Sequence, residues 1–470
     1  MAEANTTREV SLTRRLGLFD ATMIIVGNVI GVGIFTTSGL AAMALNSPGS
    51  LIAGWLIGGL LTLCGALTYA ELGAMLPHAG GEFVYLRQAY GRFSGFLNGW
   101  TYFTVTNPGS IAAMSAGLIT YLESFFPSLT FKSYLIGGEI FGRTLGISTG
   151  HLMAITVIVT FSFINYVGLR AGSLTQNVLT ILKLGTVTVI PVLGLLVGAG
   201  EWSHFSSSGG IPSSSDLFQS MSIAMVAIFF SYTGWFTSTY VASEIRDPQR
   251  NVPYSVILGT LIATAAYLLV NVLYLYALPI ERMQGVLNIG EVAALALFGS
   301  EASKYISLAI VISILGAINS VILTAPRIYY AMARDGLFFK AAARVHPKFK
   351  TPAQSILIQA IWCCVLVVSG TFSQLLTYTV VAMLSFSIMT GISIFVLRRN
   401  RPDLERPYKT LGYPWIPSIF VTAYVLALTH VVLASPTESL LGLGIVALGV
   451  PLYWLLTRRT AVSGQGSCAS

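Results

Sequence analysis

Apolar residues in this chain occur in long runs that short polar segments separate. A run of about 18 or more apolar residues is long enough to cross a bilayer as a helix. The sequence contains twelve such segments, at 18–43, 49–76, 94–122, 148–169, 173–199, 218–243, 254–279, 302–332, 354–370, 373–397, 413–434 and 437–457. We therefore predict an all-α polytopic membrane protein with twelve transmembrane helices.

Two of these segments are interrupted in the middle. The first reads Ile30-Gly31-Val32-Gly33-Ile34-Phe35, and the sixth reads Phe230-Ser231-Tyr232-Thr233-Gly234-Trp235. Glycine weakens a helix, and non-helical backbone at membrane depth is tolerated only where it is buried in protein or lines a water-filled cavity. Both segments are therefore predicted to be broken helices that line a central site.

The two breaks divide the chain into similar halves. Residues 18–199 contain five predicted spans and residues 218–398 contain five more, and each half begins with its broken helix. Because five is odd, the second half must enter the membrane from the opposite side, which predicts an inverted repeat of the kind found in LeuT-like transporters. A loop and two further helices, 399–457, lie outside this symmetry.

The remaining segments are expected outside the membrane. Residues 200–217 are rich in serine and glycine and read as an exterior loop. The N-terminal tail 1–17 and the C-terminal tail 458–470 are predicted to be cytosolic.

Composition and charge indicate that most of the surface of this protein lies in lipid. The chain is 54% hydrophobic and only 9% charged, which excludes an ordinary soluble protein. The net charge of +8 would suit a nucleic-acid partner, but its distribution favours a membrane. If both termini are cytosolic, 21 of the 26 basic residues fall on the cytosolic side, four fall outside, and only Lys183 lies within a span. We expect a multi-pass protein of the cell membrane.

The interrupted helices offer backbone groups that suit a zwitterion. The half-helix that begins near Val32 exposes N–H groups and the positive end of its dipole, which favour a carboxylate. Carbonyls before this break and at 230–233 favour an ammonium group, so an α-amino acid matches both. The alternative is that Gly27, Gly31 and Gly33 only allow close helix packing. Since neither break contains an acidic side chain, neutral amino acids are favoured.

Lys183 is unusual because it lies about 15 Å inside its span. A buried ammonium group needs acceptors, and the carbonyls of the first break, with Asn319 and Ser320, are the candidates. Its charge would then replace a metal cation and tie the broken helix to its neighbours. If it instead loses its proton on burial, Lys183 becomes a proton-coupling site. The sequence leaves both alternatives open.

Several motifs resemble a known family over nearly the whole chain. Besides the two breaks, they are YAELGAMLPHAGGEFVYLRQAYG at 69–91, DPQRNVP at 247–253, TAPRIYYAMARDG at 324–336 and RPDLERPYK at 401–409. On these residues the chain resembles the L-amino-acid transporter family of the amino acid–polyamine–organocation superfamily. The resemblance implies a five-plus-five inverted repeat, two extra helices and transport by alternating access.

The resemblance also implies a substrate site. It implies that the first break, around Ile30, binds the substrate carboxylate through the amides of Gly31, Val32 and Gly33. The amino group would be held by the carbonyls of Val29, Phe230, Ser231 and Thr233. Further residues match family positions near the site: Phe230 as an aromatic lid, Tyr267, Lys183 in place of sodium, and Ser110 and Met383 in the side-chain pocket.

Two departures from the family pattern narrow the expected substrates and partners. Thr233 stands where the family has glycine, which makes large substrates doubtful. The loop 124–147 has no cysteine, whereas animal members use one there to bond a glycoprotein, so no disulfide-linked heavy chain is expected and the chain looks prokaryotic.

The expected function is sodium-independent exchange of neutral L-amino acids, and the alternative is a proton-coupled symporter that uses Lys183. A channel or a nutrient receptor is a rival of another class. No Walker lysine loop, zinc-ligand cluster or nucleophile elbow is present, so neither an enzyme nor a cofactor or metal is expected.

Overall fold

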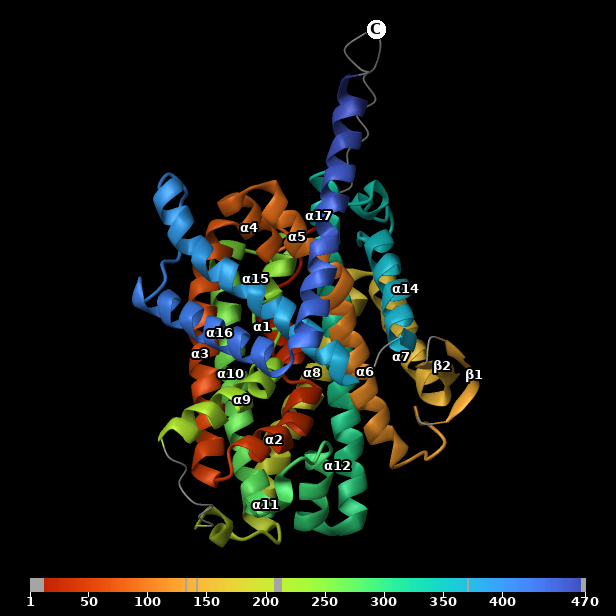
Figure 1. Ribbon diagram of the computed structural model, residues 1–470, viewed down its shortest axis with the longest axis vertical. Coiled ribbons are helices and arrows are strands. Elements are labelled where there is room, and N and C mark those ends of the chain that lie inside the picture. Colours follow the sequence, from red (N-terminus) through yellow and green to blue (C-terminus); the bar gives the residue numbers. More distant parts are fainter. Residues whose placement is uncertain (1–11, 132, 141–142, 207–213, 370–371, 466–470) are drawn as a thin grey trace.

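Long helices make up most of this protein (Figure 1). The computed structural model describes residues 12–131, 133–140, 143–206, 214–369 and 372–465. One end of the bundle, at the top of Figure 1, carries α4 (Glu82–Tyr90), and the opposite end carries α11 (Ile280–Met283).

The first half of the chain contains the first broken helix and four further long helical segments. Their bounds are α1 (Leu18–Val29), α2 (Val32–Ala44), α3 (Pro48–Met75), α5 (Arg92–Thr101), a π-helical turn η1 (Tyr102–Thr106), α6 (Asn107–Glu123), α7 (Thr149–Val167) and α8 (Leu169–Val197). Pro48 fits the first turn of α3, where its missing N–H costs nothing, and Ser47 caps that turn by accepting from Ser50 N at 3.2 Å.

The second half contains the second broken helix and further long helices, and the chain then continues with two more helices. It contains η2 (Trp202–Ser206), α9 (Ser214–Tyr232), η3 (Thr237–Glu244), α10 (Pro248–Ala277), α11, α12 (Ile289–Thr324), α13 (Pro326–Arg334), η4 (Lys340–Ala343), α14 (Ala353–Ser369), α15 (Phe372–Asn400), α16 (Trp415–Ala434) and α17 (Pro436–Gln465).

The helices agree with an all-α polytopic membrane protein. Among the described residues, nine spans are long and apolar enough to cross a membrane, and the pair α1 and α2, bent by 41°, makes a tenth. Two further predicted spans are also helical: α5, η1 and α6 run without a gap over 92–123, and α14 has 17 residues. The count of twelve crossings and the inverted repeat stay predictions.

Three local features differ from the expectation. The loop 124–147 contains an antiparallel hairpin of β1 (Tyr134–Ile140) and β2 (Arg143–Ser148), whose strands satisfy each other's backbone groups outside the helices. Helix α17 continues to Gln465, so most of the expected tail 458–470 is helical. Helix α12 begins at Ile289, well before the predicted span, and is kinked at Gly299, where φ is +79°.

The broken helices lie at the centre of the bundle. Helix α1 packs against α8, α10 and α12, and α2 packs against α9, α12 and α11. Because long helices surround them, the non-helical residues between α1 and α2 are kept away from lipid: Ile30 and Gly31 are buried.

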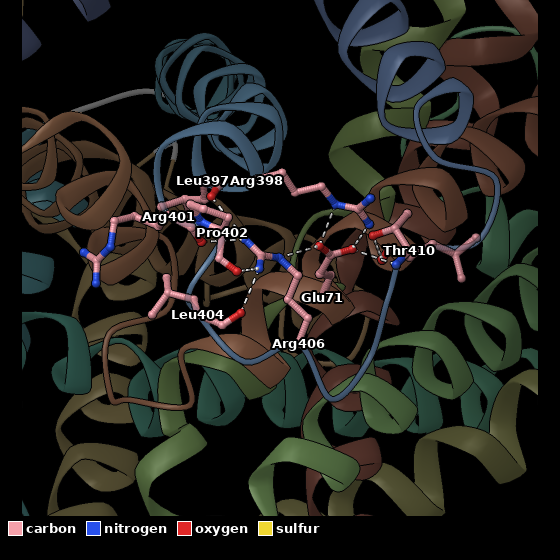
Figure 2. A network of polar contacts seen from close by, with 9 residues as sticks. Glu71, Leu397, Arg398, Arg401, Pro402, Leu404, Arg406 and Thr410 are labelled. Atoms are coloured by element: carbon pink, nitrogen blue, oxygen red, sulfur yellow. Dashed lines mark hydrogen bonds and ion pairs between the residues drawn. The ribbon is translucent and has the colours of Figure 1, made fainter.

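A buried carboxylate joins α3 to the end of α15 (Figure 2). Glu71 is fully buried and accepts hydrogen bonds from Arg398 Nε at 2.9 Å and Nη2 at 2.6 Å. The backbone N–H of Thr410 donates to the same carboxylate at 2.7 Å. The negative charge of Glu71 is therefore balanced by the guanidinium group of Arg398, and the backbone N–H of Thr410 donates a further hydrogen bond to it.

Arg406 completes this network from the loop that follows α15. Its Nε lies 3.7 Å from Glu71 Oε1, and its terminal nitrogens donate to the carbonyls of Leu397, Arg401, Pro402 and Leu404 (Figure 2). These include carbonyls at the C-terminus of α15, where a cation is favourable. The loop 401–410 is thus fixed to α3 and α15 by charge.

Removing the charge of Glu71 should destabilise the protein. In Glu71→Gln, Arg398 and Arg406 lose their counter-ion, and breaking such a buried pair costs about 3 kcal/mol. We expect a clearly lower unfolding temperature in detergent. The matched control is Asp403→Asn, which removes an exposed partner of Arg401 and should change the unfolding temperature little. An unchanged unfolding temperature in Glu71→Gln would contradict this role.

Candidate functional site

The first break separates the end of α1 from the start of α2. Ile30 has φ −73° and ψ 88°, and Gly31 has φ −124° and ψ −147°, so neither continues the helix. The first N–H groups of a helix have no partner within it. Helix α2 therefore presents the free N–H groups of Val32 and Gly33, and the positive end of its dipole, at the centre of the bundle.

The second break follows α9. The α-helix ends at Tyr232, and a 3₁₀ helix begins at Thr237. Gly234 has φ +100°, and a Cβ there would lie 2.3 Å from Oδ1 of Asn28. Only glycine fits this left-handed position against α1. Both interruptions that the sequence indicated are present.

The two breaks touch each other. The hydroxyl oxygen of Tyr267, on α10, lies 2.5 Å from the carbonyl oxygen of Val29 and 2.8 Å from that of Ser231. Its single hydrogen is shared between one carbonyl from each break. A second link is the 2.5 Å hydrogen bond between the hydroxyls of Thr37 and Ser231. The broken segments are thus held as one unit.

A small cavity of about 50 Å³ lies between the breaks. Four parts of the chain line it: the first break, the segment of η1 and α6, the second break with η3, and α12. The lining residues are Asn28, Val29, Gly31, Val32, Gly33, Tyr102, Thr106, Asn107, Ser110, Met114, Phe230, Ser231, Thr233, Gly234, Phe236, Thr237, Tyr240, Val321 and Thr324. None of these side chains carries a charge.

Most of the residues that the sequence indicated meet at this cavity. Those that line it are Val29, Gly31, Val32, Gly33, Ser110, Phe230, Ser231 and Thr233. Three do not line it. Ile30 is fully buried, Tyr267 holds the two breaks together, and the sulfur of Met383 accepts a 3.3 Å hydrogen bond from Thr233 Oγ1 behind the cavity wall.

Sequence reasoning missed the contribution of η1. Tyr102, Thr106 and Asn107 line the cavity from this π-helical turn and the start of α6. The available signal was Pro108 inside an apolar span, because proline cannot bond to the carbonyl four residues earlier. That carbonyl, on Thr104, instead accepts from Trp362 Nε1 at 3.0 Å. Such π-helical turns are frequent at functional sites.

Lys183 is fully buried on α8 and donates to the carbonyl of Gly27 at 2.6 Å. Gly27 is in the last turn of α1, where a cation complements the negative end of the helix dipole. The lysine therefore contacts the carbonyl end of the first half-helix, and both alternatives for its role share this contact.

Asn319 does not take part as expected. Its Oδ1 accepts from Asn165 at 2.8 Å and its Nδ2 donates to Gln176 Oε1 at 2.8 Å, so its side chain is engaged away from Lys183. Ser320 donates to the carbonyl of Ile24 at 3.0 Å. Both residues therefore help to hold α1 and α8 against α12 and are not acceptors of the ammonium group.

No metal site is evident. Within the described ranges, no group of three or more His, Cys, Asp or Glu side chains could hold a metal ion.

Gly33 allows the breaks to approach each other. A Cβ on Gly33 would lie 2.8 Å from the Cα of Ser231, so Gly33→Ala must push α2 away from the second break. We expect a loss of affinity for the ligand of this cavity of at least about tenfold, since about 1.4 kcal/mol of lost contact is enough. Binding is measured by ligand-induced thermal stabilisation of the purified protein.

The control for this prediction is Gly185→Ala on α8, where a Cβ would meet nothing within 4 Å. This variant should bind as the unmodified protein does. Undiminished binding by Gly33→Ala would show that the contact between the breaks is not needed.

Comparison with known proteins agrees with this architecture. The profile described as "Amino acid permease" matches residues 16–449. The chain is 30% identical to the serine/threonine exchanger SteT of Bacillus subtilis (strain 168) over 461 residues, which are 97% of this chain and 99% of SteT.

Animal proteins are similar over the same range. The b(0,+)-type amino acid transporter 1 of Rattus norvegicus is 30% identical over 95% of this chain and 89% of its own length. The large neutral amino acids transporter small subunit 2 of Homo sapiens is 28% identical over 95% of this chain and 81% of its own length. With a profile match that spans nearly all of its helices, this chain belongs to the amino acid permease family.

Proposed function

We propose that this protein is a sodium-independent exchanger of small neutral L-amino acids that works by alternating access. The observation that carries this proposal is the uncharged cavity between two broken helices, with free N–H groups on one side and carbonyl groups on the other. The names of the relatives, a serine/threonine exchanger and amino acid transporters, support the same class of substrate.

The backbone would bind the two charges that all α-amino acids share. The N–H groups of Gly31, Val32 and Gly33 lie at the positive end of α2 and would hold the carboxylate. The carbonyls of Val29, Phe230, Ser231 and Thr233 would accept from the ammonium group. The hydroxyl of Tyr267 already lies between two of these carbonyls, so it fixes their direction while each keeps a free lone pair.

The walls of the cavity favour a neutral side chain. A charged substrate side chain would lose its hydration without gaining a partner, because every lining side chain is uncharged. Phe230 would cover the bound molecule as an aromatic lid. Ser110 lines the cavity and offers a hydroxyl to a small polar side chain.

The size of the cavity favours a small substrate. Thr233 occupies space that a glycine would leave open, and its hydroxyl is held by the carbonyl of Phe229 at 3.2 Å and by Met383 at 3.3 Å. A volume of about 50 Å³ holds only a few water molecules. Even a small amino acid would therefore require Phe230 or its neighbours to move, and a large one would require more.

Lys183 would take the place of a transported cation. Its ammonium group is 2.6 Å from Gly27 O, where it supplies a fixed positive charge to the carbonyl end of α1. A bound sodium ion would not be needed there. The alternative, a proton symporter in which Lys183 loses its proton, uses the same contact.

Further parts of the proposal concern topology and partners. We place the protein in the cell membrane with both termini on the cytosolic side. In this orientation most of the basic residues lie on the cytosolic side, as is usual for membrane proteins. The five-plus-five inverted repeat would let the unit of two breaks tilt between the two sides. No disulfide-linked heavy chain is proposed, since the loop 124–147 has no cysteine.

Exchange by the purified protein in liposomes tests the proposal. Labelled serine should accumulate in sodium-free buffer only when unlabelled neutral amino acid is present inside, and the uptake should saturate. Uptake that needs no internal amino acid and responds to a pH gradient would favour the symporter. Uptake that does not saturate would favour a channel, and binding without uptake would favour a receptor. A panel of competing amino acids would then define the preferred side chain.

Replacing Lys183 tests its assigned role. Lys183→Ala removes the cation at the end of α1 and should lower the exchange rate by at least about tenfold, because a buried charge-assisted hydrogen bond of about 1.5–3 kcal/mol is lost. The matched control is Lys304→Ala, which removes an exposed lysine paired with Glu301 and should leave the rate unchanged. Equal rates for both variants would remove Lys183 from the mechanism.

A further inference from the structure

A second buried carboxylate lies near the substrate cavity. Glu82 is the first residue of α4 and is 1% exposed. The two residues before it, Gly80 and Gly81, have φ values of +111° and +49°. A Cβ on Gly81 would lie 2.5 Å from Thr239 Oγ1, and Gly80 N–H donates to the carbonyl of Tyr240 at 3.1 Å. The glycine turn thus seats Glu82 against η3, the segment after the second break.

Polar but uncharged groups surround this carboxyl. The hydroxyl of Tyr69, on α3, donates to Glu82 Oε1. Asn98 on α5, Tyr102 on η1 and Thr390 on α15 also present their polar groups to it. Over the described part of the chain, Glu82 Oε2 and both polar atoms of Asn98 have no hydrogen-bond partner of good geometry.

Glu82 has no counter-ion among the described residues. The nearest basic residue on its own helix, Arg87, pairs with Asp335 on the outer side. The titratable groups that face Glu82 from the packed elements are phenols, those of Tyr69, Tyr85, Tyr102, Tyr240 and, on α16, Tyr424. The segments of α5 and α15 contribute only amide and hydroxyl groups.

Burial therefore favours the neutral acid. An ionised carboxylate without a cation is costly in a dry environment. Burial raises the pKa of Glu82 to about 7, although hydrogen bonding by Tyr102, Tyr69, Thr390 and Asn98 opposes this change. By contrast, Glu71 has Arg398 as its partner at 2.6 Å, so Glu82 and Glu71 differ in their chemistry although both are buried.

Glu82 is one layer of side chains away from the cavity. Tyr102 and Tyr240, which face it, also line the cavity, and their rings meet edge to face at 6.0 Å. On the other side of α4, Phe83, Val84 and Arg87 line a surface groove of about 340 Å³. Helix α4 and its glycine turn thus separate Glu82 from the solvent at this end of the bundle.

We propose that Glu82 is a proton-binding site of the transport cycle. It holds a proton while α4 and η3 are packed together, and it releases that proton to the solvent at the α4 end when the two separate. The O–H bond of the carboxylic acid breaks, water accepts the proton, and repacking takes one back from the same side. This inference rests on the exchange activity proposed above.

The sign of the pH effect follows from this assignment. A group that binds protons more strongly in the packed state stabilises that state at low pH, and its ionisation favours separation as the pH rises. The equilibrium for opening should increase about tenfold between about pH 6 and about pH 8. Opening releases nearly one proton at the lower end of this range and almost none at the upper end, where Glu82 is already ionised in the packed state, so the average release is about half a proton over about two pH units. Because proton release and uptake occur on one side, the proton changes the rate and does not drive accumulation.

The test is exchange of labelled serine by the full protein in liposomes with equal pH inside and outside. The unmodified protein should become about tenfold faster from about pH 6 to about pH 8. Glu82→Gln, which resembles the protonated acid, should remain at the slow rate at every pH. Glu82→Asp should retain a pH-dependent rate, and Glu405→Gln, which removes an exposed acid, should behave as the unmodified protein does.

A second measurement does not depend on transport. Infrared difference spectra of the unmodified protein should contain a carboxylic acid band that disappears between about pH 6 and about pH 8 and is absent from Glu82→Gln. If the protein binds serine without exchanging it, the proposed function fails while this titration stands. A flat rate profile in the unmodified protein, the unmodified profile in Glu82→Gln, or no titrating band would overturn the proton site.

Discussion

The structure depends on how main-chain polar groups are satisfied in the middle of an apolar bundle. The two breaks, after α1 and after α9, leave N–H and carbonyl groups without helical partners in a region where lipid offers none. The protein meets part of this demand itself, through Tyr267 between the carbonyls of Val29 and Ser231 and through Lys183 at Gly27. The N–H groups at the start of α2 remain for a ligand. Binding and structural stability are thus two uses of the same set of backbone dipoles.

Charge is distributed so that the cavity stays neutral. Every side chain that lines it is uncharged, and the buried ion pairs lie elsewhere. Glu71 pairs with Arg398, and Glu244 at the end of η3 pairs with Arg327 on α13 at 2.8 Å. The backbone carbonyl of Glu244 also accepts from the N–H of Leu16 at 3.0 Å. The contacts of Glu244 join the segment after the second break to α13 and to the residues before α1, whereas the pair of Glu71 joins α3 to α15.

Glu82 differs from these acids because it is buried and has no cationic partner among the residues that the structure describes. The glycines before it fix it against η3, and η3 is continuous with the second break. Any movement that opens the cavity on this side must therefore alter the surroundings of Glu82. The phenols of Tyr102 and Tyr240 belong to the cavity wall and to the surroundings of this acid at once. A small molecule and a proton would thus act on the same few side chains.

The sequence by itself determined the class of the protein and the location of its breaks. Runs of apolar residues indicate helices because their length matches a bilayer. Gly33 and Gly234 mark the interruptions because a Cβ at either would collide with a neighbouring segment, and Gly234 also has a positive φ that favours glycine. Those signals are local, and local reasoning is reliable for them. The long match to the amino acid permease family agrees with this result.

Only the tertiary structure decided which distant groups meet. Asn319 is a polar residue of another span and was a candidate partner for Lys183, but its amide is engaged by Asn165 and Gln176. The π-helical turn at Tyr102 and the place of Glu82 depend on helices that are remote in the chain. A linear pattern records which residues are polar, whereas the free energy of a buried polar group depends on its partners in three dimensions.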